Sequence, residues 1–185
     1  MIRRTFFALT LAAPAAPALA QFDTLTMKPI VKAVREGDEE KVRQALLKGE
    51  NPNQIDTYSA QPLLMVAVMA GQMAIVETLL KGGAIVDTVD RDGYTALIRA
   101  AEKGDVDIVE MLLKRNAKPA AQSRQGVTAL MVAARLGHAE IVRLLLEKKA
   151  NPNTADFTGR TALAFARQAN RPSIEAMLRK AGGRE

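Results

Sequence analysis

The sequence has no cysteine, no tryptophan and only one histidine among its 185 residues. The absence of cysteine excludes disulfides, thiolate zinc sites, iron–sulfur clusters and cysteine nucleophiles. The single histidine, His138, excludes any metal site that needs several histidine ligands. Aromatic residues make up only 4% of the chain, so a core must be built from aliphatic side chains, methionine and alanine. These shortages argue against most classes of enzyme.

The remaining composition is that of a globular protein. Hydrophobic residues make up 48% and charged residues 25% of the chain, whereas disordered chains have fewer apolar residues. The formal net charge is +6, which permits an anionic partner. The basic residues do not form the dense clusters typical of nucleic-acid-binding proteins, so we expect no nucleic-acid partner.

The first twenty residues have the pattern of a cleavable export signal. Arg3 and Arg4 precede an apolar stretch, and Ala18-Leu19-Ala20 forms an A-x-A cleavage site. Residues 5–20 are too short and too rich in proline to span a bilayer, so we expect no stable membrane insertion after cleavage. The pattern therefore predicts a periplasmic or secreted protein beginning at Gln21. The paired arginines also resemble the twin-arginine motif, so both export routes stay open.

The rest of the chain repeats every 33 residues, which is typical of a stacked repeat array. The repeat is visible in glycines, threonines and apolar residues alike, as in Gly71, Gly104 and Gly137; Thr95, Thr128 and Thr161; Leu64, Leu97, Leu130 and Leu163; and Ile75, Ile108, Ile141 and Ile174. The length of the chain after residue 20 fits about five such units.

Each unit has the signals of two short helices. In the third unit, Thr95 is a suitable N-cap for a helix over 96–103, and Gly104 can adopt the left-handed conformation that ends it. Asp105 marks the start of a second helix, and Asn116 is a tolerable left-handed stop. The polar, proline- and glycine-rich connection to the next unit predicts a protruding hairpin.

At these positions the chain resembles the ankyrin repeat family. The pattern G-x-T-x-L-x-x-A-A-x-x-G followed by I-V-x-x-L-L occurs over 93–113 and 126–146. The resemblance covers residues 25–183. It implies an all-α ankyrin-repeat solenoid of about five helix-turn-helix units with hairpin loops, and a role in protein–protein recognition.

The predicted organisation is a signal peptide followed by one domain of five units. Arg167, Glu175 and Arg179 replace apolar positions of earlier units, so we expect the fifth unit to close the array as a soluble monomer. The expected boundaries are 1–20 for the signal peptide and 21–185 for the ankyrin repeat domain, with units at about 25–57 (N-terminal cap), 58–90, 91–123, 124–156 and 157–185 (C-terminal cap).

One connection breaks the period. Gly37 and Gly71 are 34 residues apart, so the segment between them holds one extra residue. Its turn position is occupied by Ala60, where later units have glycine. Because alanine adopts positive φ less readily than glycine, we expect a different turn here.

No group of residues predicts chemistry. His138 follows a helix-ending glycine, and we interpret it as a polar cap of the turn between two helices. Asp87, Asp90 and Asp92 alternate as in a calcium loop but lack its glycine and its closing glutamate, so we interpret them as hairpin acids. We therefore expect no catalytic residue, no cofactor and no metal site.

Binding is expected on the concave face, which hairpin tips and the exposed sides of the first helices would form. Aromatic and arginine residues, which dominate interface hot spots, recur at these positions. Asp56 is also expected on this face. The predicted partner-binding residues are Tyr58, Arg91, Tyr94, Lys103, Arg124, Arg135, Phe157 and Arg160.

The sequence therefore predicts an exported, non-catalytic module that binds a protein partner of acidic character. Three alternatives stay open. The chain could be a secreted effector, it could bind anionic components of the cell envelope electrostatically, or, more remotely, it could be an enzyme that uses carboxylates. Changing Arg91, Arg124 and Arg135 together to glutamate is expected to abolish capture of the partner.

Overall fold

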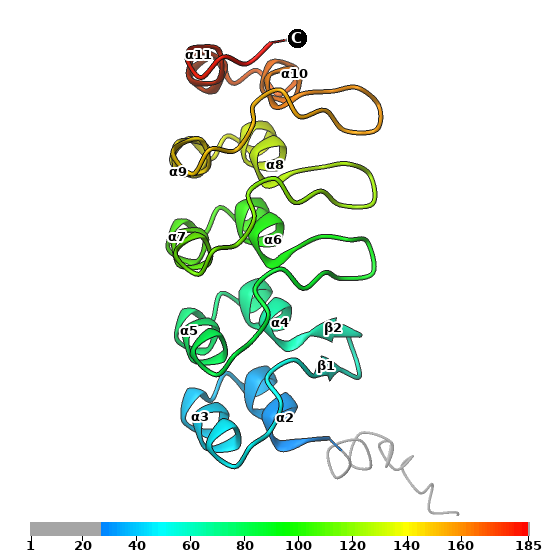
Figure 1. The fold of residues 1–185 in the computed structure, drawn as a ribbon, viewed down its shortest axis with the longest axis vertical. Helices are drawn as coiled ribbons and strands as arrows, with labels where there is room; N and C mark the ends of the chain where they lie inside the picture. Colours follow the sequence, from blue (N-terminus) through cyan, green and yellow to red (C-terminus); the bar gives the residue numbers. More distant parts are fainter. Residues whose placement is uncertain (1–26, 185) are drawn as a thin grey trace, which may run out of the picture.

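The computed structural model describes residues 27–184, which form an elongated stack of helix pairs (Figure 1). The first helices of the pairs lie in one row, and the second helices lie in a parallel row beside it. The first helices are α2 (Pro29–Glu36), α4 (Leu63–Ala70), α6 (Ala96–Lys103), α8 (Ala129–Leu136) and α10 (Ala162–Gln168). The second helices are α3 (Glu39–Leu47), α5 (Met73–Lys81), α7 (Val106–Lys114), α9 (Ala139–Glu147) and α11 (Pro172–Lys180).

The third helix pair forms as its sequence predicts. The Thr95 side chain accepts a hydrogen bond from the backbone N–H of Ile98 at the start of α6, and Gly104 ends that helix with φ 77°. The Asp105 side chain accepts from the N–H of Ile108 at the start of α7. Asn116 follows this helix with φ 62°. Local capping therefore sets the helix boundaries in this unit.

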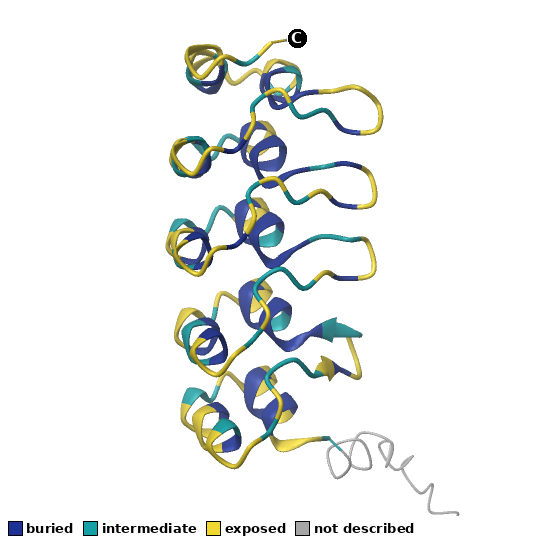
Figure 2. Ribbon diagram, in the orientation of Figure 1, coloured by how far each residue is buried: buried dark blue, intermediate teal, exposed yellow. Residues whose placement is uncertain are grey.

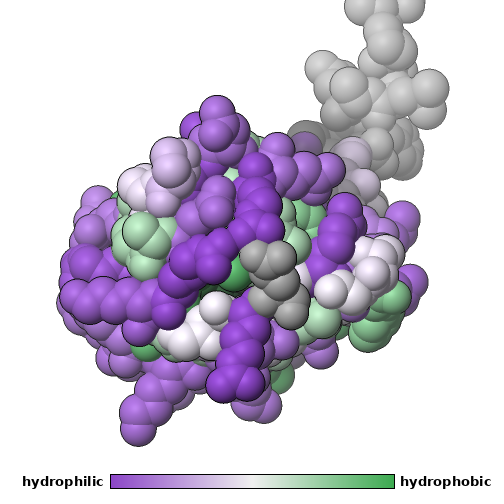
Figure 3. Space-filling view, turned by 90° about the horizontal axis from the view of Figure 1, so that it is seen from above, coloured by the Kyte–Doolittle hydropathy of each residue, from purple (hydrophilic) through white to green (hydrophobic). Residues whose placement is uncertain are grey.

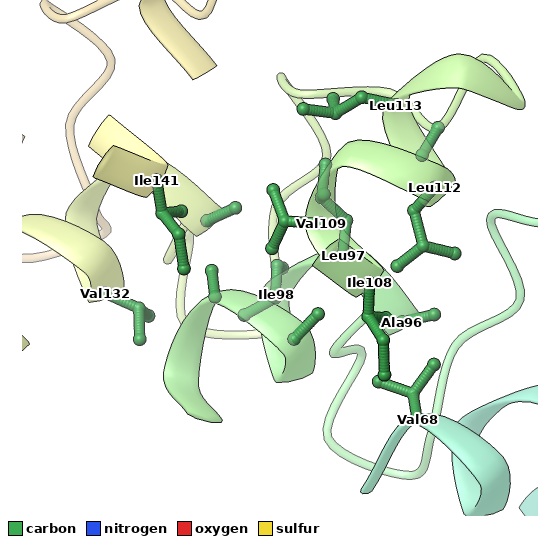
Figure 4. Packing of buried hydrophobic residues seen from close by; sticks show 14 of the residues in the cluster. Val68, Ala96, Leu97, Ile98, Ile108, Val109, Leu112, Leu113, Val132 and Ile141 are labelled. Carbon is green, nitrogen blue, oxygen red and sulfur yellow. The ribbon is translucent and has the colours of Figure 1, made fainter. Parts of the chain in front are cut away.

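The core is shared between neighbouring pairs. Figure 4 shows Val68 of α4 beside Ile108 of α7, while Val132 of α8 and Ile141 of α9 approach the same unit from its other side. All four are 2% exposed or less. Buried residues concentrate on the first helices and on the sides of the second helices that face them (Figure 2). Each pair thus shelters the apolar sides of its neighbours, which confirms the predicted solenoid.

Hairpins project from the stack on the side opposite the second helices (Figure 1). We call them finger 1 (55–62), finger 2 (89–95), finger 3 (122–128) and finger 4 (155–161). Finger 1 contains the short antiparallel strands β1 (Ile55–Asp56) and β2 (Gln61–Pro62). Fingers 2 and 4 have only single bridges, Val89 with Thr95 and Ala155 with Thr161.

The turn of finger 1 differs from the others, as predicted. The Ala60 N–H donates to the carbonyl of Asp56, four residues back, at 2.7 Å. In finger 2 the Gly93 N–H donates to the carbonyl of Asp90, three residues back, at 3.0 Å. Ala60 nevertheless has a positive φ of 52°. The extra residue thus widens the turn, and an alanine occupies a conformation that favours glycine.

The α10–α11 end of the described array carries charged groups at positions that are apolar in earlier units. Arg167 and Glu175 form an ion pair at 3.6 Å, and Arg179 is exposed. The end view shows a mostly hydrophilic surface with small, separate apolar patches (Figure 3). Such an end does not favour stacking of a further apolar unit.

None of the helices over residues 27–184 is long and apolar enough to cross a membrane.

Candidate functional site on the finger face

The finger tips and the finger-facing sides of the first helices form a continuous surface, which we call the finger face. Its tips are joined by backbone hydrogen bonds. The Arg124 N–H donates to the Asp92 carbonyl at 3.0 Å, and the Phe157 N–H donates to the Gln125 carbonyl at 3.1 Å. Fingers 2, 3 and 4 therefore form one ridge.

Glycine permits this close approach. A β-carbon on Gly93 would lie 2.8 Å from the backbone nitrogen of Arg124, and one on Gly126 would lie 2.8 Å from that of Phe157. Finger 1 is not joined in this way, since Arg91 makes no such backbone bond to it within the described part of the chain. Backbone hydrogen bonds thus hold fingers 2, 3 and 4 together.

A polar side chain is buried at the base of each finger. Asp56, Asp90, Ser123 and Asp156 are all 8% exposed or less. The Asp90 carboxylate accepts the N–H groups of Asp92 and Tyr94 at 3.0 and 2.9 Å. These side chains hold the turns, which confirms Asp90 as a hairpin acid. The expectation that Asp56 lies on the binding surface is wrong, because this acid is only 1% exposed.

The other two acids of the calcium-like pattern are Asp87 and Asp92, and they lie in different environments. Asp87 accepts a hydrogen bond from the backbone N–H of Lys118 at 3.0 Å, so it links consecutive units. Asp92 is exposed at the tip of finger 2. No group of three or more metal-ligating side chains occurs between residues 27 and 184.

Three of the finger acids also pair with an arginine that lies over an aromatic ring. The ring, acid and arginine come together as Arg35 with Tyr58 and Asp56, Arg99 with Tyr94 and Asp90, and Arg160 with Phe165 and Asp156. Their guanidinium-to-ring distances are 4.5, 4.1 and 4.5 Å respectively. Tyr94 and Arg160, two predicted binding residues, thus also hold their fingers against the first helices.

These contacts change the acidity of the finger acids. Burial alone would raise the pKa of Asp156, but hydrogen bonds from Thr158 and from the backbone and guanidinium of Arg160 outweigh it and lower the pKa to about 2. Burial also opposes ionisation of Asp56, yet bonds from Ser59 and Tyr58 and the charge of Arg35 lower its pKa below 3.8. Both acids are therefore charged near neutral pH.

The predicted set contains three arginines without an acidic partner. Arg91, Arg124 and Arg135 are exposed, and no carboxylate of residues 27–184 lies within ion-pair distance of their guanidinium groups. Lys103 has no ion pair with any acid of the described segment, and its Nζ donates to the carbonyl of Met69 at 3.0 Å. The finger face therefore carries positive charge that the described structure does not neutralise.

Cations on the second helices are arranged differently. Lys81 pairs with Glu77 at 2.7 Å and Lys114 with Glu110 at 2.9 Å, each one helical turn apart. Five basic residues on this side have such partners: Lys41, Arg43, Lys81, Lys114 and Arg143. These cations are neutralised within their own helices, whereas Lys48, Arg115 and Lys148, which follow α3, α7 and α9, form no ion pair within residues 27–184.

Apolar groups accompany the free arginines. Phe157, at the tip of finger 4, is 74% exposed and Tyr58, on finger 1, is 51% exposed. Met69 and Leu136, near the ends of α4 and α8, are 46% and 38% exposed. A surface that combines free guanidinium groups with exposed aromatic and aliphatic side chains can bind acidic and apolar groups together.

Sequence analysis missed Arg35, Arg99 and Phe165 on this face. Arg35 and Arg99 occupy different positions along their helices, so the 33-residue period does not group them. Phe165 is only 4% exposed, and its ring lies beneath the guanidinium groups at this face. The only signal in the sequence is that each arginine belongs to a first helix close to a finger acid.

His138 has a structural position. It precedes α9 as its N-cap residue, but its side chain makes no capping bond. Instead its ring covers Gly104 of the previous unit, where a β-carbon would lie 2.6 Å from the ring. His138 therefore lies at the turn between two helices as expected, but the expectation that its side chain caps this turn is wrong, because the ring packs against the neighbouring unit.

The arrangement agrees with comparisons with known proteins. A family model described as ankyrin repeats (3 copies) matches residues 30–123 and again residues 118–183. The comparison with curated proteins gives no match. The two matched segments span almost all of the described helices and fingers. The chain therefore belongs to the ankyrin repeat family.

Proposed function

We propose that this chain is an exported, non-catalytic module that binds a protein partner of acidic character on its finger face. Ankyrin repeats are protein–protein interaction modules, which supports a protein partner. The observation that carries the proposal is the bonded row of finger tips, which presents Arg91 and Arg124, without an ion pair in residues 27–184, on the same ridge as the exposed ring of Phe157.

The free arginines favour an acidic partner for a physical reason. Arg91 and Arg124 are at equivalent positions of neighbouring fingers, and the backbone bond from Arg124 to Asp92 fixes the two fingers together. Their guanidinium groups are therefore presented on one ridge with little freedom of the backbone. A preorganised row of cations binds carboxylates with a smaller loss of entropy than flexible loops would.

Export is part of the proposal and rests on residues 1–20, which lie outside the described residues. The paired Arg3 and Arg4, the apolar stretch and the A-x-A site at Ala18–Ala20 support it. Removal of these residues, which include two arginines and no acid, would leave a formal charge of +4. The proposed location is the periplasm or the external medium.

The test is capture of a partner by the purified, immobilised chain from a periplasmic fraction and from culture medium, with identification by mass spectrometry. We expect the Arg91→Glu/Arg124→Glu/Arg135→Glu variant to lose the captured protein while keeping its helical circular dichroism. Capture that survives all three substitutions would contradict the assignment to the finger face.

A matched control places the same charge change elsewhere. Lys48, Arg115 and Lys148 follow α3, α7 and α9 and are exposed. The variant Lys48→Glu/Arg115→Glu/Lys148→Glu should destabilise the fold more than the finger-face variant does, because acids at helix C-termini are unfavourable. We expect it to retain capture.

Repeating the capture at rising salt separates a shaped interface from binding to anionic envelope components. A shaped interface keeps much of its affinity at 0.5 M salt, since its buried contacts are poorly screened, whereas purely electrostatic association is lost. Loss of all capture at moderate salt, regardless of the partner, would favour the second candidate.

A further inference from the structure

Two arginines share one aromatic ring on the finger face. The Arg160 guanidinium lies 4.5 Å and the Arg135 guanidinium 5.9 Å from the centre of the Phe165 ring. The ring is buried, so these two like charges are held near each other by the packing of α8, α10 and finger 4. Like charges at such a site repel unless an anion lies with them.

Among the described residues, only one acid forms an ion pair with either of these two arginines. Arg160 donates from Nε and Nη2 to one oxygen of Asp156 at 3.1 and 2.9 Å. The remaining oxygen of Asp156 accepts from Thr158 and from the backbone of Arg160. Arg135 has no carboxylate within ion-pair distance in residues 27–184.

Comparison with the other units explains why Arg135 has no acidic partner among the described residues. Arg35 stands at the same helix position as Arg135, two residues before the helix-ending glycine, and pairs with Asp56 of the following finger. For Arg135 the corresponding acid is Asp156, which Arg160 already occupies.

The finger before α8 offers no substitute. Arg99 of α6 pairs with Asp90 of its preceding finger at 2.7 Å. At the equivalent position before α8 the chain has Ser123, which bonds Gln125 and the turn backbone instead. The finger before α8 therefore lacks the acid that Arg99 uses in the third unit.

A small hollow lies beside this unpaired arginine. Its volume is about 60 Å³, and it is lined by Tyr94, Val127, Met131, Val132, Arg135 and Arg160, with Phe165. The accessible lining is more polar than apolar, and the two guanidinium groups border it. A hollow of this kind can receive the end of one carboxylate side chain.

We propose that this hollow between α8, α10 and fingers 2, 3 and 4 receives an acidic side chain of the partner, whose carboxylate pairs with Arg135. The methylene groups of that side chain lie against Tyr94 and Val127, and its charge compensates the second guanidinium at the Phe165 ring. This inference rests on the proposed function and adds to it a single anchoring position.

The test is a double-mutant cycle on peptides selected for binding. A displayed library of random twelve-residue peptides is selected against the purified chain, and binders are synthesised as C-terminal amides so that side chains supply the only carboxylates. We expect selected peptides to contain a glutamate or aspartate whose change to the amide weakens binding to the wild-type chain at least tenfold. Against Arg135→Gln the same change should weaken binding less than twofold.

The outcomes separate this inference from the proposed function. Peptides that lose affinity on Arg91→Glu/Arg124→Glu but are indifferent to Arg135→Gln would overturn the anchoring site and leave the finger face in place. A selection that gives no peptide sensitive to any of the three arginines would overturn both. Arg115→Gln, an exposed change after α7, is the control and should alter affinity less than twofold.

Discussion

Phe157 lies directly against Gly126 of the neighbouring finger. A β-carbon on that glycine would be 2.8 Å from both the backbone nitrogen and the Cδ1 atom of Phe157. Gly159 occupies the same position one finger further on and has a similar φ, 84° against 78°. No described atom lies within 4 Å of a β-carbon there. The two glycines therefore separate the effect of backbone conformation from that of contact between fingers.

Changing each glycine to alanine tests this contact. Both substitutions place a side chain at positive φ, which costs about 1 kcal/mol. Gly126→Ala must in addition displace Phe157 and its bond to Gln125, so we expect it to lower the free energy of unfolding by about 1 kcal/mol more than Gly159→Ala. Urea denaturation measures both. Equal losses would show that contact between the fingers contributes nothing.

Ala60 allows the reverse substitution, from alanine to glycine at a positive φ. This residue has φ 52° at the turn of finger 1, a conformation that disfavours a β-carbon. We expect Ala60→Gly to raise the free energy of unfolding by up to about 1 kcal/mol, because the relief of strain exceeds the added flexibility of the unfolded chain. The measurement is again urea denaturation. A loss of stability would mean that the wider turn already accommodates alanine.

Asp156 predicts a dependence of stability on pH. Its pKa is about 2 in the folded chain, below the ordinary value of 3.8, so the folded state favours the charged form. The stabilisation is complete above about pH 4 and is lost as the pH falls toward 2. We expect Asp156→Asn to be less stable than wild type by about 1 kcal/mol at pH 7 and equal to it near pH 2. A difference between the two proteins that stays constant across this range would contradict the role of the charge.

Removing the charges at the α10–α11 end of the array should make the chain self-associate. Arg167, Glu175 and Arg179 stand where the previous unit has Ala134, Val142 and Leu146. The variant Arg167→Ala/Glu175→Val/Arg179→Leu recreates an apolar stacking surface, so we expect it to self-associate at micromolar concentration. Sedimentation velocity measures this against the wild-type chain. A variant that sediments like wild type would show that these charges do not limit stacking.

The fold was predictable from the sequence because its signals are local and repeated. Thr95 and Gly104 set the bounds of α6 through bonds within a few residues, and the 33-residue period places the same signals in each unit. The different turn at Ala60 was predictable for the same reason, since a missing glycine in a repeated position is visible in the sequence.

The pairing of charges on the finger face was not predictable. Arg160 and Arg135 are both arginines near a finger, yet one is bound to Asp156 and the other is free. The difference depends on which guanidinium group lies within reach of the Asp156 carboxylate. It also depends on how both guanidinium groups pack against the ring of Phe165. Such choices depend on side-chain torsions and on distances across units, which the repeat period does not contain.

The central claim is that partners are held on the finger face, and site-specific photo-cross-linking tests it most directly. A photoreactive phenylalanine analogue is placed in the full-length chain at Arg91, Arg124 or Phe157 on the finger ridge, or at Arg43, Glu110 or Arg143 on the second helices. The account predicts the same cross-linked species from the three finger positions and none from the helix positions. Cross-links that form from the second helices, with none from the fingers, would contradict it.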